Sequence, residues 1–470
     1  MRRKILKGAR VITMDPGRPD HEKLDILVED DRIAAVAERV DETDAEIIDL
    51  PDRIVVPGFV NAHLHTWQTA LRGTGADWTL HEYLARTHGE IARRYSASDL
   101  HIGTLAGALN QLDSGVTTVG DWCHNCRTPD HADAAIEALT EAGIRAVFLH
   151  GTAHGGPKKP HNIHEVDRLL SGPIAENELL TLGMAIKGPQ LSSSETALTD
   201  LRAGAERGLL VSMHQSVGRP SAAWTKVSDA GLWGPRTNIV HGTGISGQML
   251  RTMVEAGATF TSTPENELAQ GHCTSIVEDL LAIGAQVSLG TDTEIAVAGD
   301  VLAAARISLA RVRARAHDYS RSTSGLSAPE VGTSTKHALS WITTEGARAL
   351  GLDHRIGSIK PGMQADIVVI DARAFNLLPA HNPLAATLHS HPGNVEAVMV
   401  GGDWRKRNHA LVHPDLRRIA QELERSAERF IDESVSTGVM TRARREVVRR
   451  VVHRAMLRQA RSGEDTPTSH

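Results

Sequence analysis

The sequence predicts an α/β protein built on a (β/α)8 TIM-type barrel, with a small β-sandwich domain formed from both ends of the chain and a helical C-terminal extension. Three observations carry this prediction. β-branched runs alternate with helical segments through the middle of the chain, strand patterns frame that region on both sides, and a charge-rich helical pattern follows. Aromatic residues make up only 3% of the chain, so aliphatic side chains fill the core, as is typical of parallel strands covered by helices.

The barrel is expected over residues 58–355, where strand-like runs alternate with helical patterns. Eight βα units are the number that closes such a barrel. The predicted strands are IVVPGFVNA, GVTTVGDW, GIRAVFLHG, LTLGMAIKGP, GLLVSMHQS, NIVHGTG, ATFTSTP and AQVSLGTDT. The carboxyl ends of barrel strands meet at one mouth, so the side chains at those ends are the candidates for a functional site.

The two ends of the chain are expected to form the smaller domain together. Residues 1–57 contain short strand patterns separated by turns, which is typical of a small antiparallel unit. Strand patterns return over residues 356–410, in GSIKPGMQADIVVID and NVEAVMVGGDWRK, and these strands are expected to pair with the first ones. Residues 411–470 predict an amphipathic helix pair that is solvated or, as the alternative, packs against a partner subunit.

Length and charge narrow the class of protein. A chain of 470 residues is long enough for a large barrel with an annex and a sizeable core. A formal net charge of −6 favours neither a nucleic acid nor a membrane surface as partner. The three cysteines cannot form a disulfide framework, the N-terminus lacks the long apolar stretch of a signal peptide, and no apolar run reaches 18 residues. We therefore expect a cytoplasmic protein.

Histidines and one carboxylate stand at the ends of four predicted barrel strands. His63 and His65 end the first strand, and their spacing of two places both side chains on the same side of it. The fifth strand ends in His214, the sixth in His241 and the eighth in Asp292. Imidazole and carboxylate ligands suit zinc, iron, cobalt or nickel. The pattern therefore predicts a metal site at the barrel mouth.

These motifs resemble those of the amidohydrolase superfamily, and within it the cytosine-deaminase-like and triazine-hydrolase-like branch. The resemblance spans almost the whole chain, from GARVIT to MQADIVVID. Its most specific stretches, in order, are PGFVNAHLHTWQTALRG, GVTTVGD, IVHGTGIS, SLGTDT and IGSIKPGMQADIVVIDAR.

The resemblance implies a role for each strand-end residue. His63, His65 and His214 are implied metal ligands, and Asp292 is an implied ligand or near-ligand that takes a proton from the metal-bound water. His241 is implied either to bind metal or, more usually in this branch, to hydrogen-bond the substrate. Trp67, Gln68 and Arg72 follow the first ligand pair, at places where substrate contacts are expected, with a structural turn at Arg72-Gly73 as the alternative for Arg72.

A divalent ion with three protein ligands and an open position lowers the pKa of bound water and supplies hydroxide at neutral pH. Zinc is the expected ion, with iron, cobalt and manganese as alternatives, and one ion is favoured over two. The expected reaction is hydrolysis of a C–N bond in a small molecule, by deamination or by substituent displacement on an N-heterocycle. The nitrogen that leaves needs a proton, which calls for a general acid.

The sequence departs from the branch at that general acid. Related aminohydrolases carry a glutamate a few residues after the strand-5 histidine, but this chain reads His214-Gln215-Ser216-Val217 and has no carboxylate before Asp229. Glu265, after the seventh strand, is the expected substitute, and Glu294 is another candidate.

A second interpretation rests on Lys187, at the end of the fourth strand. In binuclear members of the superfamily a carboxylated lysine at this place bridges two metals, and His241 would then bind the second ion. Such enzymes need no shuttle glutamate. The alternative function is therefore hydrolysis of an amide, urea, carbamate or cyclic amide. The resemblance also implies a homo-oligomer, a dimer or larger.

Overall fold

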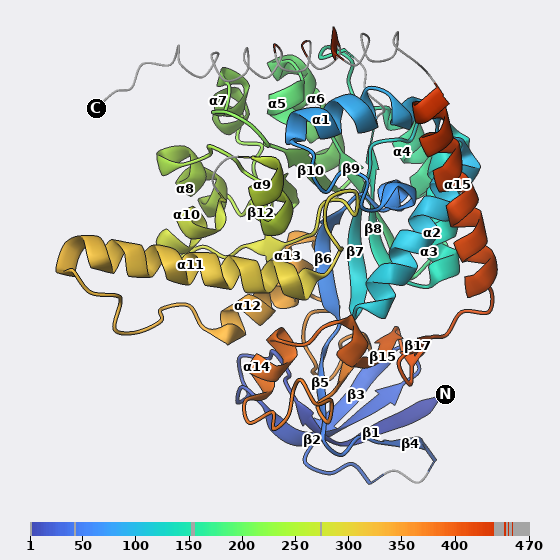
Figure 1. Ribbon diagram of the computed structural model, residues 1–470, viewed down its shortest axis with the longest axis vertical. Helices are drawn as coiled ribbons and strands as arrows, with labels where there is room; N and C mark the ends of the chain where they lie inside the picture. The colour runs from blue at the N-terminus through green and yellow to red at the C-terminus, as the bar shows by residue number, and fades with distance from the viewer. Residues whose placement is uncertain are drawn as a thin grey trace.

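The computed structural model describes residues 2–41, 44–151, 156–272 and 275–436, together with residues 446, 447, 450 and 454. Its centre is a parallel sheet of eight strands in chain order, curled into a barrel (Figure 1). The (β/α)8 prediction is confirmed. The barrel strands are β6 (Phe59–Leu64), β7 (Val116–Cys123), β8 (Arg145–Gly151), β9 (Leu180–Ala185), β10 (Leu210–His214), β11 (Thr237–Val240), β12 (Thr259–Ser262) and β13 (Ser288–Leu289).

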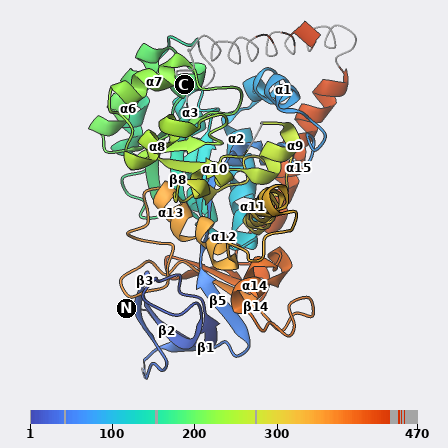
Figure 2. The same ribbon diagram turned by 90° about the vertical axis from the view of Figure 1, so that its left-hand side faces the viewer.

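Helices connect successive barrel strands and cover the outside of the barrel (Figures 1 and 2). The long connection after β6 contains η1 (Thr66–Leu71), α1 (Leu80–Tyr83), η2 (Leu84–His88), η3 (Ile91–Arg94) and α2 (Ala97–Asp113). The later ones are α3 (Pro129–Ala142), α4 (Ile163–Leu170), α5 (Gly188–Leu191), α6 (Ser194–Glu206), α7 (Ala222–Asp229), α8 (Gly247–Glu255), α9 (Pro264–Gln270), α10 (Val277–Ala282), α11 (Val301–Ser324), α12 (Thr335–Trp341) and α13 (Thr344–Ala349).

Local sequence accounts for where these helices begin and end. Ser96 caps α2 in a reciprocal arrangement with Asp99, which satisfies two backbone donors that the first helical turn leaves free. α3 begins with Pro129 and ends at Gly143, whose φ of 67° is the left-handed conformation that glycine adopts without strain. None of the described helices combines the length and the apolarity needed to cross a bilayer.

The barrel closes where its last strand meets its first. The amide of His65 donates to the carbonyl of Asp292 at 2.8 Å, and the amide of Asp292 donates to the carbonyl of His63 at 3.0 Å. A Cβ atom on Gly290 would lie 2.6 Å from the His63 carbonyl oxygen and 2.7 Å from its nitrogen. Only glycine therefore allows the two strands to approach this closely, and the closure holds residues 63–65 against residue 292.

The two ends of the chain form a second sheet below the barrel, in the order β17-β16-β15-β14-β5-β1-β2-β3, with β4 paired to β1 (Figure 1). This sheet encloses a separate apolar core that includes Leu6, Ile26, Val55 and Val369. Its strands are β1 (Arg3–Val11), β2 (Glu22–Glu29), β3 (Arg32–Ala37), β4 (Glu46–Asp49), β5 (Arg53–Pro57), β14 (Ile367–Asp371), β15 (Val395–Val400), β16 (Asp403–Arg407) and β17 (Ala410–Leu411), with α14 (Pro383–Leu388) between β14 and β15.

Two details of the expected topology are corrected. The run IVVPGFVNA, expected as one barrel strand, is divided: β5 belongs to the small sheet and β6 to the barrel. Gly58 joins them in a place where a Cβ would lie 2.0 Å from the Thr117 hydroxyl. The N-terminal unit is also not purely antiparallel, because β1 pairs in parallel with both β4 and β5.

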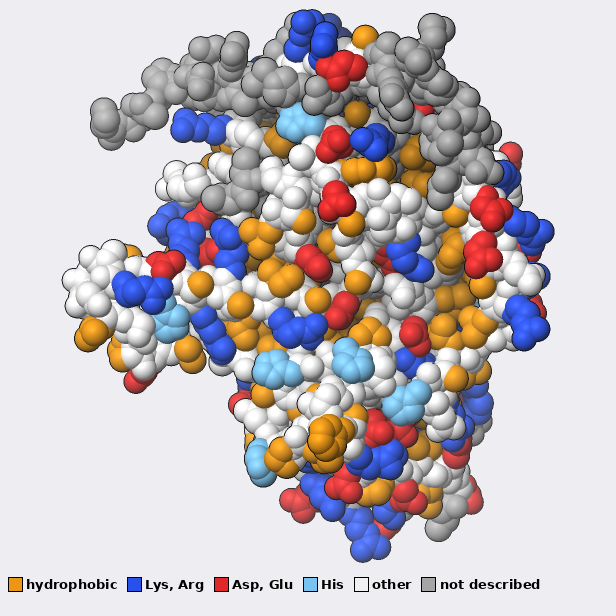
Figure 3. Space-filling model, viewed as in Figure 1, with side chains coloured by type: hydrophobic (Ala, Val, Ile, Leu, Met, Phe, Trp, Pro, Cys, Tyr) orange, Lys and Arg blue, Asp and Glu red, His pale blue; other side chains and the backbone are white. Residues whose placement is uncertain are grey.

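Two helices lie outside the regular barrel. α15 (Leu416–Ser436) runs along the side of the barrel against α2 and buries Ile419 and Phe430 (Figure 2). The second helix expected in the tail lies outside the described residues apart from four isolated positions. α11 projects from the barrel and stands out on the left of Figure 3.

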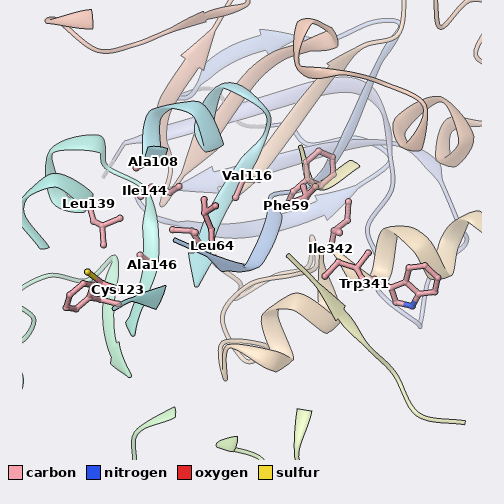
Figure 4. Packing of buried hydrophobic residues seen from close by; sticks show 14 of the residues in the cluster. Phe59, Leu64, Ala108, Val116, Cys123, Leu139, Ile144, Ala146, Trp341 and Ile342 are labelled. Carbon is pink, nitrogen blue, oxygen red and sulfur yellow. The ribbon is translucent and has the colours of Figure 1, made fainter. Parts of the chain in front are cut away.

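The barrel and its helices share one large apolar core. Figure 4 shows part of it, in which Phe59, Val116 and Ile342 pack near the start of β6. The two units are also joined by a buried ion pair, in which Arg145 of β8 contacts Asp366, the residue before β14, at 2.7 Å. Buried charges are stable only when paired in this way. This ion pair thus attaches the small sheet to the N-terminal end of barrel strand β8.

The close approach at the closure gives a first prediction. Gly290→Ala should lower the free energy of unfolding by roughly 1–3 kcal/mol, because the added methyl group overlaps the His63 backbone. Gly332→Ala is the matched control, since a Cβ there meets nothing within 4 Å. Its effect should stay within about 0.5 kcal/mol. Urea unfolding of both variants provides the measurement, and equal midpoints would contradict the packing described for the closure.

Candidate active site

Three imidazoles and one carboxylate converge at the mouth of the barrel. One ligand atom from each of His63, His65, His214 and Asp292 lies within 4.8 Å of the others. The Nε2 atoms of His63 and His65 are both 3.2 Å from Asp292 Oδ1, and His214 Nε2 is 3.3 Å from His63 Nε2. The closed barrel brings together side chains from the ends of β6 and β10 and from the segment after β13.

The electrostatic state of the group suits metal binding. Burial lowers the pKa of His63 to about 3, and loss of hydration lowers the pKa of His214 well below its ordinary value. Burial alone would raise the pKa of Asp292, but hydrogen bonds from His63 and His65 hold it well below its usual range. Burial therefore keeps His63 and His214 neutral beside the Asp292 carboxylate, and a cation bound here would take the lone pair of each imidazole nitrogen in place of its hydrogen bond.

Contacts behind the ligands orient them. His65 Nδ1 lies 2.7 Å from the Trp122 carbonyl oxygen, which only accepts, so Nδ1 carries the proton and Nε2 faces the group. The Trp122 indole in turn donates to the Ser212 hydroxyl at 3.1 Å. Asp292 and His241 both adopt positive φ, 64° and 65°, which is strained for residues other than glycine. Such strain is typical of functional residues that the surrounding fold holds in place.

His241 lies beside the group and has its own carboxylate partner. Its ring centroid is 5.4 Å from that of His214, and its Nδ1 is 3.2 Å from Glu267 Oε1. Glu267 also accepts from the Thr263 amide at 2.7 Å and from the Ser262 hydroxyl at 2.8 Å. The carboxylate thus places the proton of His241 on Nδ1 and leaves Nε2 as the free ring nitrogen.

Besides His241, three substrate contacts were predicted, and the structure buries two of them and pairs the third with a carboxylate. Trp67 and Gln68 are fully buried; Gln68 exchanges hydrogen bonds with Tyr83 and accepts one from the Thr293 hydroxyl. Arg72 instead forms an ion pair with Glu294 at 2.6 Å. Glu294 also accepts from Asn110, so this alternative proton donor is already engaged on both oxygens.

Glu265, the expected substitute for the shuttle glutamate, and Lys187, the expected bridge of a binuclear site, are not among the four converging metal-binding residues. Glu265 stands in the first turn of α9, half-buried, with Asp300 and Arg306 as its charged neighbours. Burial raises its pKa. Lys187 donates to the backbone carbonyls of Gly156 and Lys159 at 2.9 and 2.8 Å. The structure therefore does not bring Lys187 into the group of metal-binding atoms.

Several residues at the site are ones that the sequence does not single out, or that it indicates only as structural or incidental. Asn266 donates to Asp292 Oδ2, and the His272 ring lies 4.6 Å from that of His241, although His272 reads as incidental in the sequence. His124 packs on His65 with a ring distance of 4.1 Å. The polar run STPENE after the seventh strand indicated that this connection lies at the site. The sequence does not show which of its residues face the site, because that depends on where helix α9 begins.

Within the described part of the chain, one further group has ligands within reach of each other: Asp371, Glu396 and His409, on the small sheet. Arg373 holds Asp371 at 2.8 Å, and Arg53 holds Glu396 at 2.8 Å. These carboxylates already have cationic partners. The buried histidine group therefore fits a divalent transition metal, because its nitrogen and oxygen donors are neutral or anionic and preorganised.

The family model for the amidohydrolase family matches residues 54–405, which covers most of the chain. The chain belongs to the amidohydrolase family. It is a metal-dependent hydrolase that acts on C–N bonds. Among similar curated proteins, the 5'-deoxyadenosine deaminase of Methanosarcina mazei is 25% identical over 449 residues, which cover 91% of this chain and 98% of that protein. The 5-methylthioadenosine/S-adenosylhomocysteine deaminase of Thermococcus onnurineus is 27% identical over 81% of this chain and 89% of its own length.

Solved structures share the fold of this amidohydrolase. An adenosine deaminase from Xanthomonas campestris with bound zinc superposes with a TM-score of 0.78 at 21% identity, covering 91% of this chain and 98% of that one. Atrazine chlorohydrolase from Arthrobacter aurescens, in complex with zinc, has a TM-score of 0.74 at 22% identity and covers 90% of this chain and 100% of its own.

The geometry of the metal group gives a second prediction. His214→Ala should weaken zinc binding by at least about 100-fold, because it removes one of the converging donors. His164→Ala is the control, since that histidine is exposed on α4. Zinc per chain is measured by plasma mass spectrometry after dialysis against a weak chelator. Unchanged zinc content in His214→Ala would show that the ligand assignment is wrong.

Proposed function

We propose that this amidohydrolase binds one zinc ion through His63, His65, His214 and Asp292 and hydrolyses an exocyclic C–N bond of an N-heterocycle, by deamination or by displacing another substituent. The observation that carries the proposal is the convergence of three imidazoles and one carboxylate at the barrel mouth. Similar proteins named as deaminases of 5'-deoxyadenosine and methylthioadenosine support the reaction class.

When bound, the ion supplies Lewis acidity that lowers the pKa of water toward neutrality. Asp292 is the proposed proton acceptor as water attacks the ring carbon, because its low pKa keeps it ionised and two histidines hold it in place. His241 is the proposed substrate contact, with its proton position set by Glu267. Its free Nε2 would accept a hydrogen bond from the substrate or donate one when protonated.

The nitrogen that leaves must gain a proton. Glu265 is the proposed donor, since burial raises its pKa and thereby favours the protonated form. Its neighbour Asn266 donates to Asp292, so the helical turn that carries Glu265 lies next to the reacting centre, although the Glu265 side chain itself has Asp300 and Arg306 as its charged neighbours. Trp67 and Gln68 are proposed to form the buried wall of the substrate site.

A second candidate reaction is hydrolysis of an amide, urea, carbamate or cyclic amide. The segment after His214 favours it, because Gln215, Ser216 and Val217 provide no carboxylate, and Gln215 uses its amide group to bond the Val217 carbonyl. The binuclear version with a carboxylated Lys187 receives no support from the position of that side chain on the carbonyls of Gly156 and Lys159.

We also propose a cytoplasmic, homo-oligomeric protein that acts on a small molecule and binds neither nucleic acid nor membrane. The compartment is inferred from the three cysteines, which cannot form a disulfide framework, and the absence of nucleic-acid and membrane partners from the mild net negative charge. Exposed apolar side chains on the projecting helix α11 and just after it support a subunit contact, since Tyr319 on the helix and Leu326 beyond its end are each 72% exposed.

The third prediction concerns the reaction. Zinc-loaded protein should release ammonia from aminated pyrimidines, purines or triazines, and Asp292→Asn should lower kcat by about 10²–10⁴-fold through loss of the proton acceptor. Asp318→Asn, on the exposed part of α11, should leave the rate unchanged. Ammonia is followed in a screen that also contains amides, ureas and carbamates.

Each outcome of the screen is decisive. Ammonia from a heterocycle supports the first reaction, whereas turnover confined to amides, ureas or carbamates supports the second. If Asp292→Asn retained full activity, its role would be wrong. If the zinc-loaded protein turned over no substrate of either class, both reactions would be excluded for these compounds.

A further inference from the structure

A chain of three buried polar side chains leads away from Asp292, and the roles described above do not use it. Asn266 donates through Nδ2 to Asp292 Oδ2 and to Gln270 Oε1, the latter at 3.4 Å. Gln270 Oε1 is also 3.2 Å from His272 Nε2. Their exposed fractions are 1% for Asn266, 4% for Gln270 and 2% for His272. The chain therefore runs from Asp292 to the ring of His241, against which His272 packs.

The end of helix α9 holds these side chains in place. Gly271 has a φ of 80° and terminates the helix, and the amide of His272 turns back to the Glu267 carbonyl at 3.0 Å. The Gly271 amide also bonds this carbonyl, at 3.2 Å, so a glycine in the left-handed conformation closes the end of the helix. The Thr243 hydroxyl donates to the His272 carbonyl at 2.9 Å and fixes the residue from the neighbouring connection. The three side chains are thus preorganised on rigid backbone.

Asp292 determines which atoms of the chain donate and which accept. A carboxylate oxygen only accepts, so the amide nitrogen of Asn266 must face it, and Asn266 Oδ1 points elsewhere. Gln270 accepts a hydrogen bond from the Asn266 amide nitrogen on Oε1, so its Nε2 donor faces away from Asn266. His272 donates from Nε2 to the same oxygen, so Nδ1 of the neutral ring is an acceptor.

One buried polar atom of each of the three side chains has no hydrogen-bond partner among the described residues: Asn266 Oδ1, Gln270 Nε2 and His272 Nδ1. Buried polar groups are almost always paired, because an unpaired one loses its hydration without compensation. Three such atoms in one connected cluster, next to Asp292 and His241, indicate a buried place where a polar ligand would supply the missing hydrogen-bond partners. Together they offer two acceptors and one donor.

We propose that Asn266, Gln270 and His272 form the recognition edge for a heterocycle in which one ring nitrogen lies between two N–H groups. The two N–H groups satisfy Asn266 Oδ1 and His272 Nδ1, and the ring nitrogen accepts from Gln270 Nε2. This inference rests on the proposed function, since it names the substrate class of the same site. It singles out diaminated rings from heterocycles that carry one amino group.

The test compares binding of 2,4-diaminopyrimidine, which has this arrangement, with binding of 4-aminopyrimidine, which lacks one N–H donor. Calorimetry on the zinc-loaded full-length protein should give at least about tenfold tighter binding of the diamino compound. The reason is that 4-aminopyrimidine lacks the second N–H group and so leaves one buried acceptor of the protein unpaired. Ammonia is followed in the same samples, so that binding is separated from turnover.

Two variants test the named atoms. Gln270→Glu replaces the Nε2 donor by an acceptor and should weaken binding of the diamino compound at least about tenfold. His272→Phe keeps a planar ring without its nitrogens and should abolish the preference between the two compounds. Gln248→Glu makes the same charge change on an exposed face of α8 and should change neither value. Zinc content shows that each variant retains its metal site.

Equal affinity of wild-type protein for the two compounds would overturn the proposal, as would a preference that survives in both variants. Its failure is distinguishable from failure of the proposed function. Turnover of a heterocycle without any diamino preference removes the recognition edge alone. A clear preference in a protein that hydrolyses no C–N bond removes the proposed reaction and leaves the binding site in place.

Discussion

The backbone hydrogen bonds between the first and last barrel strands are the constraint on which the site depends. They join His63 and His65 to Thr291 and Asp292, residues that are more than 220 positions apart in the chain. The same bonds that close the barrel therefore also bring an imidazole pair to a carboxylate. The strands can approach this closely because Gly290 has no Cβ atom to meet the His63 backbone.

Burial then gives these side chains their chemical character. Imidazoles that lose hydration stay neutral, while Asp292 stays ionised only because His63 and His65 hydrogen-bond to it. Two supporting contacts fix the proton position on a histidine ring: the Trp122 carbonyl holds the Nδ1 proton of His65, and Glu267 holds that of His241. Asp292 also fixes the orientation of the Asn266 amide, because its carboxylate oxygen can only accept a hydrogen bond. The Asn266 amide in turn fixes which atoms of Gln270 and His272 donate and which accept.

The sequence predicted the barrel and the approximate places of its strands because these depend on local patterns. The spacing of His63 and His65 follows from alternation along a strand, and the other strand-end residues follow from the βα rhythm. The division between β5 and β6 was not predictable, since both halves of IVVPGFVNA have the same apolar pattern and only Gly58 separates them.

The positions of side chains on the segments that follow the barrel strands could not be predicted from strand alternation. Alternation cannot tell whether Lys187, which follows the end of β9, faces the barrel axis, and the structure turns it toward the carbonyls of Gly156 and Lys159. Within STPENE, the register of a short helix decides which polar side chain reaches Asp292. Such contacts join segments distant in sequence, so they become visible only with the tertiary structure.

The most direct test of the central claim is anomalous diffraction at the zinc edge from crystals of the zinc-loaded protein. The account predicts one strong peak per chain, within bonding distance of the Nε2 atoms of His63, His65 and His214 and of an Asp292 oxygen. A structure in which the zinc lies elsewhere, or in which these four side chains no longer converge, would contradict it.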